Sequence, residues 1–97
     1  MAAQPLAADA VESMVANLPG WAYADDALTK TFEFKDFRAA VSFIVRMAFY
    51  ADELNHHPEL ENVYNRVTLT LKTHDAGDKV TDLDIKLAQH IEDFVWV

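Results

Sequence analysis

The sequence predicts an α+β fold with its elements in the order αββαββα. Two observations predict it: apolar and polar residues alternate in two segments, each beside a shorter candidate strand, and apolar residues recur every three or four positions in three other segments. Two hairpins separated by a helix are typical of an antiparallel sheet. We therefore expect a four-stranded antiparallel sheet with helices packed on one face.

The size of the chain sets limits on its organisation. It has 97 residues, of which 52% are apolar, with two glycines and three prolines. We expect one folded domain over residues 1–97. The chain has no cysteine, which excludes disulfides, thiolate metal ligands and a thiol nucleophile. A domain this small without such cross-links depends on its apolar core or on self-association.

The first three elements are a helix and a hairpin. The helix is expected over residues 8–18, where apolar residues fall at i, i+3, i+4 and i+7: Val11, Met14, Val15 and Leu18. Pro19 and Gly20 then end it. A short strand over residues 21–24, the turn "ADDA" and an alternating strand over residues 28–34 predict the hairpin.

The next helix is expected over residues 37–54, with Asp36 as its N-cap. Its apolar residues form two faces, one made of Phe37, Val41, Ile44 and Ala48, and the other of Phe43, Met47, Tyr50 and Leu54. A helix that is apolar on two faces is covered on both. We expect one face to pack on the sheet and the other to meet a second copy of the chain. A helix buried wholly inside its own domain is the alternative.

The last three elements are a second hairpin and a helix. Pro58 keeps the residue before it out of the helical region, so the long helix has ended by "NHHP". A short strand over residues 60–64, a turn at Asn65-Arg66 and an alternating strand over residues 67–71 follow, and then the loop "HDAGDKV". Thr81 opens the last helix, whose buried face holds Leu87, Ala88, Ile91, Phe94 and Val95.

The charge of the chain argues against two classes of partner. Its net charge is −8, whereas nucleic acids and anionic membranes attract clustered Lys and Arg. The N-terminus has no cationic segment followed by an apolar run, and the stretch "FRAAVSFIVRMAFYA" is too short to span a bilayer. We expect a cytoplasmic protein that binds neither nucleic acid nor membrane.

Three of the four histidines lie in residues 55–75: His56, His57 and His74. Adjacent residues of an extended chain point in opposite directions, and none of the usual zinc spacings is present, so we expect no metal. Histidine exchanges protons near neutral pH, which predicts general acid–base chemistry without a cofactor. The alternative is that these are half-exposed polar residues at the ends of elements, as we expect for His90 on the outer side of the last helix.

The segment "DELNHHPELENVYNRVTLTLKTHDAG" followed by "TDLDIKLA" resembles the pterin-4a-carbinolamine dehydratases, also called 4a-hydroxytetrahydrobiopterin dehydratases. Upstream, "GW" and "TFEFKDFRAAVSFI" are similar to the same family, so the resemblance covers nearly the whole chain. The loop "DAGDKVTDLD" reads as one residue longer than in the animal enzymes, which makes both Asp82 and Asp84 candidates for the matching acid. "DIKLA" continues the family pattern best from Asp84.

The resemblance implies the same αββαββα fold, assembled into dimers through the sheet and into tetramers through the long helix. It also implies a lyase reaction, loss of water from a 4a-hydroxytetrahydropterin to give the quinonoid dihydropterin, as a step in tetrahydrobiopterin recycling. That reaction needs one acid and one base, and no metal or redox cofactor.

The resemblance further implies six site residues, namely catalytic His56, His57 and His74, and substrate-binding Asp52, Pro58 and Asp84. We expect His56 and His74 to be the acid–base pair and His57 to position the substrate. The two aspartates would orient the imidazoles, and the proline would fix the His-His geometry. Thr81 and Asp84 also have the spacing of a capping box, so Asp84 could serve only as a helix cap.

Two other functions fit the same residues. Animal members of the family also serve as dimerisation cofactors of a transcription factor, which would make this chain a binding module. Alternatively, it could be a dehydratase that acts on another pterin.

Overall fold

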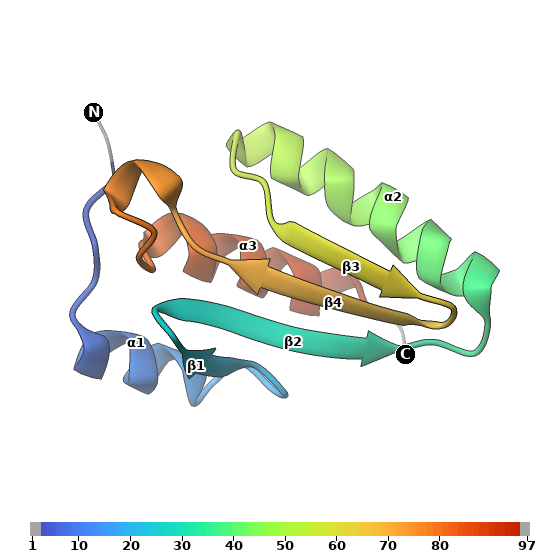
Figure 1. Cartoon of the computed structure of the whole chain (residues 1–97), viewed down its shortest axis with the longest axis horizontal. Coiled ribbons are helices and arrows are strands. Elements are labelled where there is room, and N and C mark those ends of the chain that lie inside the picture. Colours follow the sequence, from blue (N-terminus) through green and yellow to red (C-terminus); the bar gives the residue numbers. More distant parts are fainter. Residues whose placement is uncertain (1–2, 96–97) are drawn as a thin grey trace.

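The computed structural model describes residues 3–95 and contains the predicted order of elements (Figure 1). The elements are α1 (Ala8–Val15), β1 (Ala22–Ala24), β2 (Ala27–Glu33), α2 (Phe37–Leu54), β3 (Glu59–Val63), β4 (Arg66–Leu71), the 3₁₀ turn η1 (His74–Ala76) and α3 (Asp82–Phe94). The first helix ends three residues earlier than expected, although Leu18 is still buried in the core.

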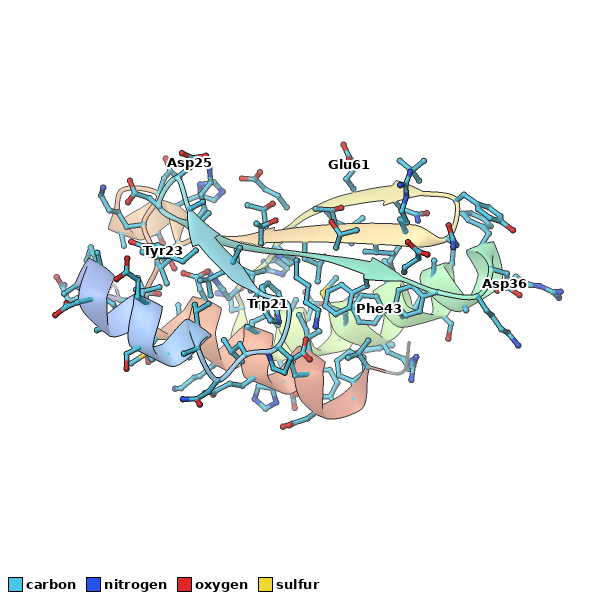
Figure 2. The ribbon with its side chains drawn as sticks, turned by 90° about the horizontal axis from the view of Figure 1, so that it is seen from below. Trp21, Tyr23, Asp25, Asp36, Phe43 and Glu61 are labelled. Carbon is cyan, nitrogen blue, oxygen red and sulfur yellow. The ribbon has the colours of Figure 1, made fainter. Side chains whose placement is uncertain are left out.

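The four strands form one antiparallel sheet in the order β1-β2-β4-β3. Strand β4 pairs with β2 on one side and with β3 on the other. The helices lie on one face of the sheet, and Glu61 points away from them on the other face (Figure 2). The α+β fold expected from the sequence is therefore confirmed.

The core lies between the sheet and the helices. The alternation seen in the sequence places Val67, Leu69 and Leu71 of β4 on this side, all fully buried. The rings of Phe32 and Phe43 meet with their centroids 4.9 Å apart, and burying such a side chain contributes about 1.5–3 kcal/mol. The candidate site forms just beyond the far end of β4, at Lys72, Thr73 and His74.

Both hairpin turns contain residues with positive φ. The first turn lies at residues 25–26, where both aspartates are left-handed, as a tight hairpin turn requires. The second turn was expected at Asn65-Arg66, and this was wrong by one residue. The turn is at residues 64–65, and Arg66 pairs with Val63. The side chain of Asn62 stabilises this register by donating to the carbonyl oxygens of residues 64 and 66, at 3.1 and 2.9 Å.

Helix α2 begins as expected, since the Asp36 carboxylate accepts a hydrogen bond from the Ala39 N–H at 2.8 Å. Phe43 and Met47 face the core, with exposures of 0% and 2%. The opposite side carries an exposed apolar stripe, which we call the outer stripe of α2: Phe37, Val41, Val45 and Phe49. The alternative of a helix buried wholly inside its own domain is therefore wrong.

Within residues 3–95, no helix is both long enough and apolar enough to cross a membrane. The longest, α2, has 18 residues and is interrupted by four charged side chains: Arg38, Arg46, Asp52 and Glu53.

Candidate active site

A pocket of about 220 Å³ lies where the end of α2, the end of β4 and the start of α3 meet. Its lining residues are Asn55, His56, His57, Lys72, Thr73, His74, Asp75 and Leu83. The three histidines singled out in the sequence therefore line one pocket. Of the other expected site residues, Asp52 and Asp84 each bond one of these histidines from outside the lining, and Pro58 directly follows His57.

The end of α2 sets the direction of the two adjacent histidines. Asn55 adopts a left-handed conformation with φ 50°, and the His56 N–H donates to the Ala51 carbonyl at 3.0 Å. This arrangement is a common way to end a helix, and asparagine accepts it better than most residues. The chain therefore leaves helix α2 at Asn55. Pro58, which was expected to end the helix, lies three residues further on.

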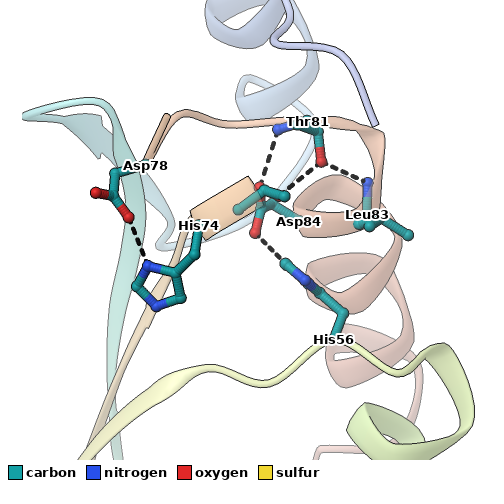
Figure 3. Close-up of polar contacts among 7 residues, drawn as sticks. His56, His74, Asp78, Thr81, Leu83 and Asp84 are labelled. Atoms are coloured by element: carbon teal, nitrogen blue, oxygen red, sulfur yellow. Dashed lines mark hydrogen bonds and ion pairs between the residues drawn. The ribbon is translucent and has the colours of Figure 1, made fainter. Parts of the chain in front are cut away.

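His56 and Asp84 form a buried pair. Nε2 of His56 lies 2.5 Å from Oδ1 of Asp84, and the two residues are 8% and 0% exposed. His56 is therefore not half exposed, which was the alternative interpretation of the sequence, because its ring points inward to the start of α3. The pair joins two segments that are distant in the sequence (Figure 3).

The other oxygen of Asp84, Oδ2, accepts two hydrogen bonds. The Thr81 N–H donates at 2.9 Å and the Thr73 hydroxyl donates at 2.8 Å. The Thr81 hydroxyl in turn accepts from the Leu83 N–H, so the predicted capping box is present. Asp84 is thus both a helix cap and the partner of His56. Thr73, which is buried and lines the pocket, also belongs to this network, and it was not among the expected site residues although it directly precedes His74.

The other two histidines also face carboxylates, but at the surface. Nε2 of His57 lies 2.9 Å from Oδ1 of Asp52, with side-chain exposures of 57% and 82%. Nδ1 of His74 lies 2.5 Å from Oδ1 of Asp78, with exposures of 71% and 58%. Asp78 was not expected at the site, because a spacing of four residues inside a loop predicts no contact.

The three pairs share one geometry that suits proton transfer. In each, one ring nitrogen faces a carboxylate, and within residues 3–95 the other ring nitrogen makes no hydrogen bond. When the nitrogen that faces the carboxylate carries a hydrogen, the opposite nitrogen can accept a proton, and the carboxylate stabilises the resulting imidazolium. In the same part of the chain, no group of three or more His, Asp or Glu side chains converges as metal ligands would.

Two other surface features lie apart from this pocket. His90 is exposed on α3 and stacks on Tyr50 with their ring centroids 5.5 Å apart, so it lies outside the site as expected. A larger hollow of about 520 Å³ lies between α2 and α3, lined by Arg46, Phe49, Tyr50, Glu53 and Phe94. Because it contains no histidine–carboxylate pair, its size alone does not make it the better candidate.

Known proteins share this sequence along nearly its whole length. It matches the family described as "Pterin 4 alpha carbinolamine dehydratase" over residues 4–94. A protein of Opitutus terrae named "Putative pterin-4-alpha-carbinolamine dehydratase" is 54% identical over 87 residues, which are 90% of each chain. A protein of Rhizobium etli with the same name is 49% identical over 94 residues, covering 95% of this chain and 92% of the other.

The fold is also shared with a solved structure. The crystal structure of a transcriptional coactivator/pterin dehydratase from Brucella melitensis matches with a TM-score of 0.87 and 42% sequence identity, covering 92% of this chain and 96% of that one. The matched residues 4–94 include all three histidines of the pocket. The resemblance noted in the sequence is confirmed, and the chain belongs to the pterin 4 alpha carbinolamine dehydratase family.

Proposed function

We propose that the chain is a dehydratase that removes water from a 4a-hydroxytetrahydropterin to give the quinonoid dihydropterin. The observation that carries this proposal is the meeting of three histidine–carboxylate pairs at one pocket. Family membership supports a pterin as the substrate. Dehydration of such a compound needs two proton transfers and no change of oxidation state, which is chemistry that imidazoles can supply alone.

The reaction breaks the bond between C4a and the hydroxyl oxygen. An acid protonates that oxygen, which leaves as water, while a base removes a proton from the pterin ring and the ring electrons form the new double bond. We assign the acid to His56, because its Nε2 faces the buried carboxylate of Asp84 and its Nδ1 is left to donate a proton to the leaving oxygen. We assign the base to His74, whose exposed ring can return its proton to water. His57, held by Asp52, positions the substrate.

The direct test is to follow the conversion of 4a-hydroxytetrahydropterin with and without the protein. We expect the wild-type protein to accelerate it well above the spontaneous rate, and His56→Ala and His74→Ala to lose most of the acceleration. His90→Ala is the matched control, since His90 is an exposed histidine outside the pocket. A wild-type rate equal to the spontaneous rate would refute the proposal.

The identity of the pterin is a separate question. The pocket of about 220 Å³ is partly open to solvent, so that a C6 substituent can extend outside it. We propose the tetrahydrobiopterin-derived compound as the substrate and the cytoplasm as the location. Comparing kcat/KM for carbinolamines with different C6 side chains would show whether another pterin is preferred.

A binding module is the second candidate function. The outer stripe of α2 supports it, since four exposed apolar side chains on one helix mark a surface for a protein partner. The name of the Brucella structure also includes the words "transcriptional coactivator". The two functions separate by mutation: His56→Ala should abolish dehydration and spare partner binding, whereas Phe49→Glu should disrupt binding through α2.

A further inference from the structure

The segment between β4 and α3 folds back on itself. The Thr73 N–H donates to the Lys79 carbonyl at 2.8 Å, and the Asp78 N–H donates to the Thr73 carbonyl at 3.1 Å. Two consecutive residues of this bend have positive φ, Gly77 at 74° and Asp78 at 60°. The result is a small closed loop that brings the side chain of Asp78 against that of His74 (Figure 3).

Asp78 occupies a backbone conformation that glycine would adopt at lower cost. Aspartate is one of the few other residues that tolerate it. A glycine at this position would relax the backbone but would have no side chain. Asp78 instead supplies a carboxylate, whose Oδ1 lies 2.5 Å from Nδ1 of His74. Both side chains are more than half exposed, so the pair contributes little to stability. Its main effect therefore falls on the imidazole ring of His74.

We propose that Asp78 is a positioning residue for His74. It accepts the hydrogen on Nδ1, holds the ring at the pocket, and leaves Nε2 to exchange a proton with the substrate. This inference rests on the proposed function, in which His74 is the base. The tautomer that Asp78 imposes on His74 can nevertheless be tested without measuring activity.

The physical need for such a partner follows from the exposure of His74. A neutral imidazole in water favours the hydrogen on Nε2 and, without a partner, rotates freely, so the accepting nitrogen would point away from the substrate. A carboxylate at Nδ1 selects the other tautomer and fixes the ring. It also stabilises the imidazolium that forms when Nε2 takes the proton. Each of the three histidines of the pocket would then have its own orienting carboxylate.

Asp26 offers a matched control for Asp78. Both have φ 60°, and their side chains are 51% and 58% exposed. Asp26 accepts one hydrogen bond from Nζ of Lys79 at 2.9 Å, and this bond and its charge raise the pKa of that lysine. Asp26→Gly therefore relaxes a left-handed residue and releases a contact to the same loop, without touching His74.

The first test needs no substrate. Long-range ¹H–¹⁵N spectra of the whole protein, with His74 assigned from His74→Ala, report which ring nitrogen carries the hydrogen. We expect the Nδ1–H tautomer in the wild type and in Asp26→Gly, and the Nε2–H tautomer in Asp78→Gly. A wild-type His74 with its hydrogen on Nε2 would overturn the proposal, even if the protein were an active dehydratase.

The second test uses the dehydratase assay. Asp78→Gly should lower kcat about tenfold, the lower end of the loss seen when metal-bound histidines lose such carboxylate partners. KM should hardly change, because Asp78 does not touch the substrate, and Asp26→Gly should keep the wild-type kcat. The kcat of Asp78→Asn should lie between those of Asp78→Gly and the wild type, since the amide oxygen still accepts the hydrogen bond from Nδ1 but carries no charge. Equal kcat in Asp78→Gly and the wild type would overturn the proposal. An inactive wild type would refute the dehydratase activity, and the tautomer of His74 would then decide whether Asp78 orients the ring.

Discussion

The imidazole of His56 and the carboxylate of Asp84 lie 28 residues apart in the sequence and 2.5 Å apart in space, both buried. A buried pair of this kind ties the stability of the fold to the chemistry of the pocket. Removing the imidazole of His56 leaves Oδ1 of Asp84 without a hydrogen bond and out of reach of bulk water, which costs about 1–3 kcal/mol. The surface pairs of His57 and His74 carry no such penalty.

We therefore expect His56→Ala and His74→Ala to lose turnover to a similar extent but to differ in stability. Each should lower turnover about 10²-fold or more, the usual scale of general acid–base catalysis. His56→Ala should also lose about 1–3 kcal/mol of unfolding free energy, because Oδ1 of Asp84 loses its hydrogen bond, whereas His74→Ala should unfold like the wild type. Urea denaturation and the assay on the same samples would check this. Equal stability of the two variants would contradict the buried pairing.

The two roles of Asp84 can be separated with Asp84→Asn and Thr81→Ala. In Asp84→Asn, the amide oxygen can still cap α3, while the amide nitrogen faces His56 and can only donate, so Nε2 must give up its hydrogen. We expect turnover to fall at least about tenfold at a nearly unchanged melting temperature. Thr81→Ala should do the opposite, losing about 1 kcal/mol of stability and keeping most of the turnover. Unchanged turnover in a less stable Asp84→Asn would reduce Asp84 to a helix cap.

The order of elements could be predicted because it depends on local periodicity. Strand β4 shows this best, since apolar Val67, Leu69 and Leu71 alternate with polar residues in the sequence and are the side chains that the strand buries in the core. The helix caps at Asp36 and Thr81 were predictable for the same reason, because a cap contacts residues only two or three positions away.

The contacts of the site that depend on loop shape could not be predicted. The hydrogen bond between Asp78 and His74 forms because two consecutive residues of the loop are left-handed. No pattern of side chains in the sequence predicts this loop conformation. The turn after β3 was missed by one residue because Tyr64, an unfavourable residue for positive φ, adopts it. The outward face of α2 was undecided because both faces are apolar, and only packing distinguishes Phe43 from Phe49.

A chelator test addresses the chemistry of the pocket. Because the proposed mechanism moves two protons between imidazoles and the substrate, we expect EDTA to leave turnover unchanged after prolonged dialysis. Dialysed protein that regains activity only on addition of a divalent ion would instead assign the histidines to a metal. Measuring turnover before dialysis, after it, and after addition of Zn²⁺ distinguishes these results.

The last prediction concerns self-association through the outer stripe of α2. Phe49 is 72% exposed and Phe43 is fully buried, although both are phenylalanines of the same helix. We expect the wild type to sediment as a homo-oligomer, because a stripe of four exposed apolar side chains on one helix marks a surface that a partner covers. Phe49→Glu should yield a smaller, folded species, since a charge in the contact opposes association. Phe49→Leu is the matched control and should keep the wild-type mass.

Phe43→Glu should instead unfold the chain, because it places a carboxylate among the buried rings of Phe32 and Phe34. Sedimentation velocity and circular dichroism would separate these outcomes, and a wild-type protein that remains a stable monomer at high concentration would refute the interface.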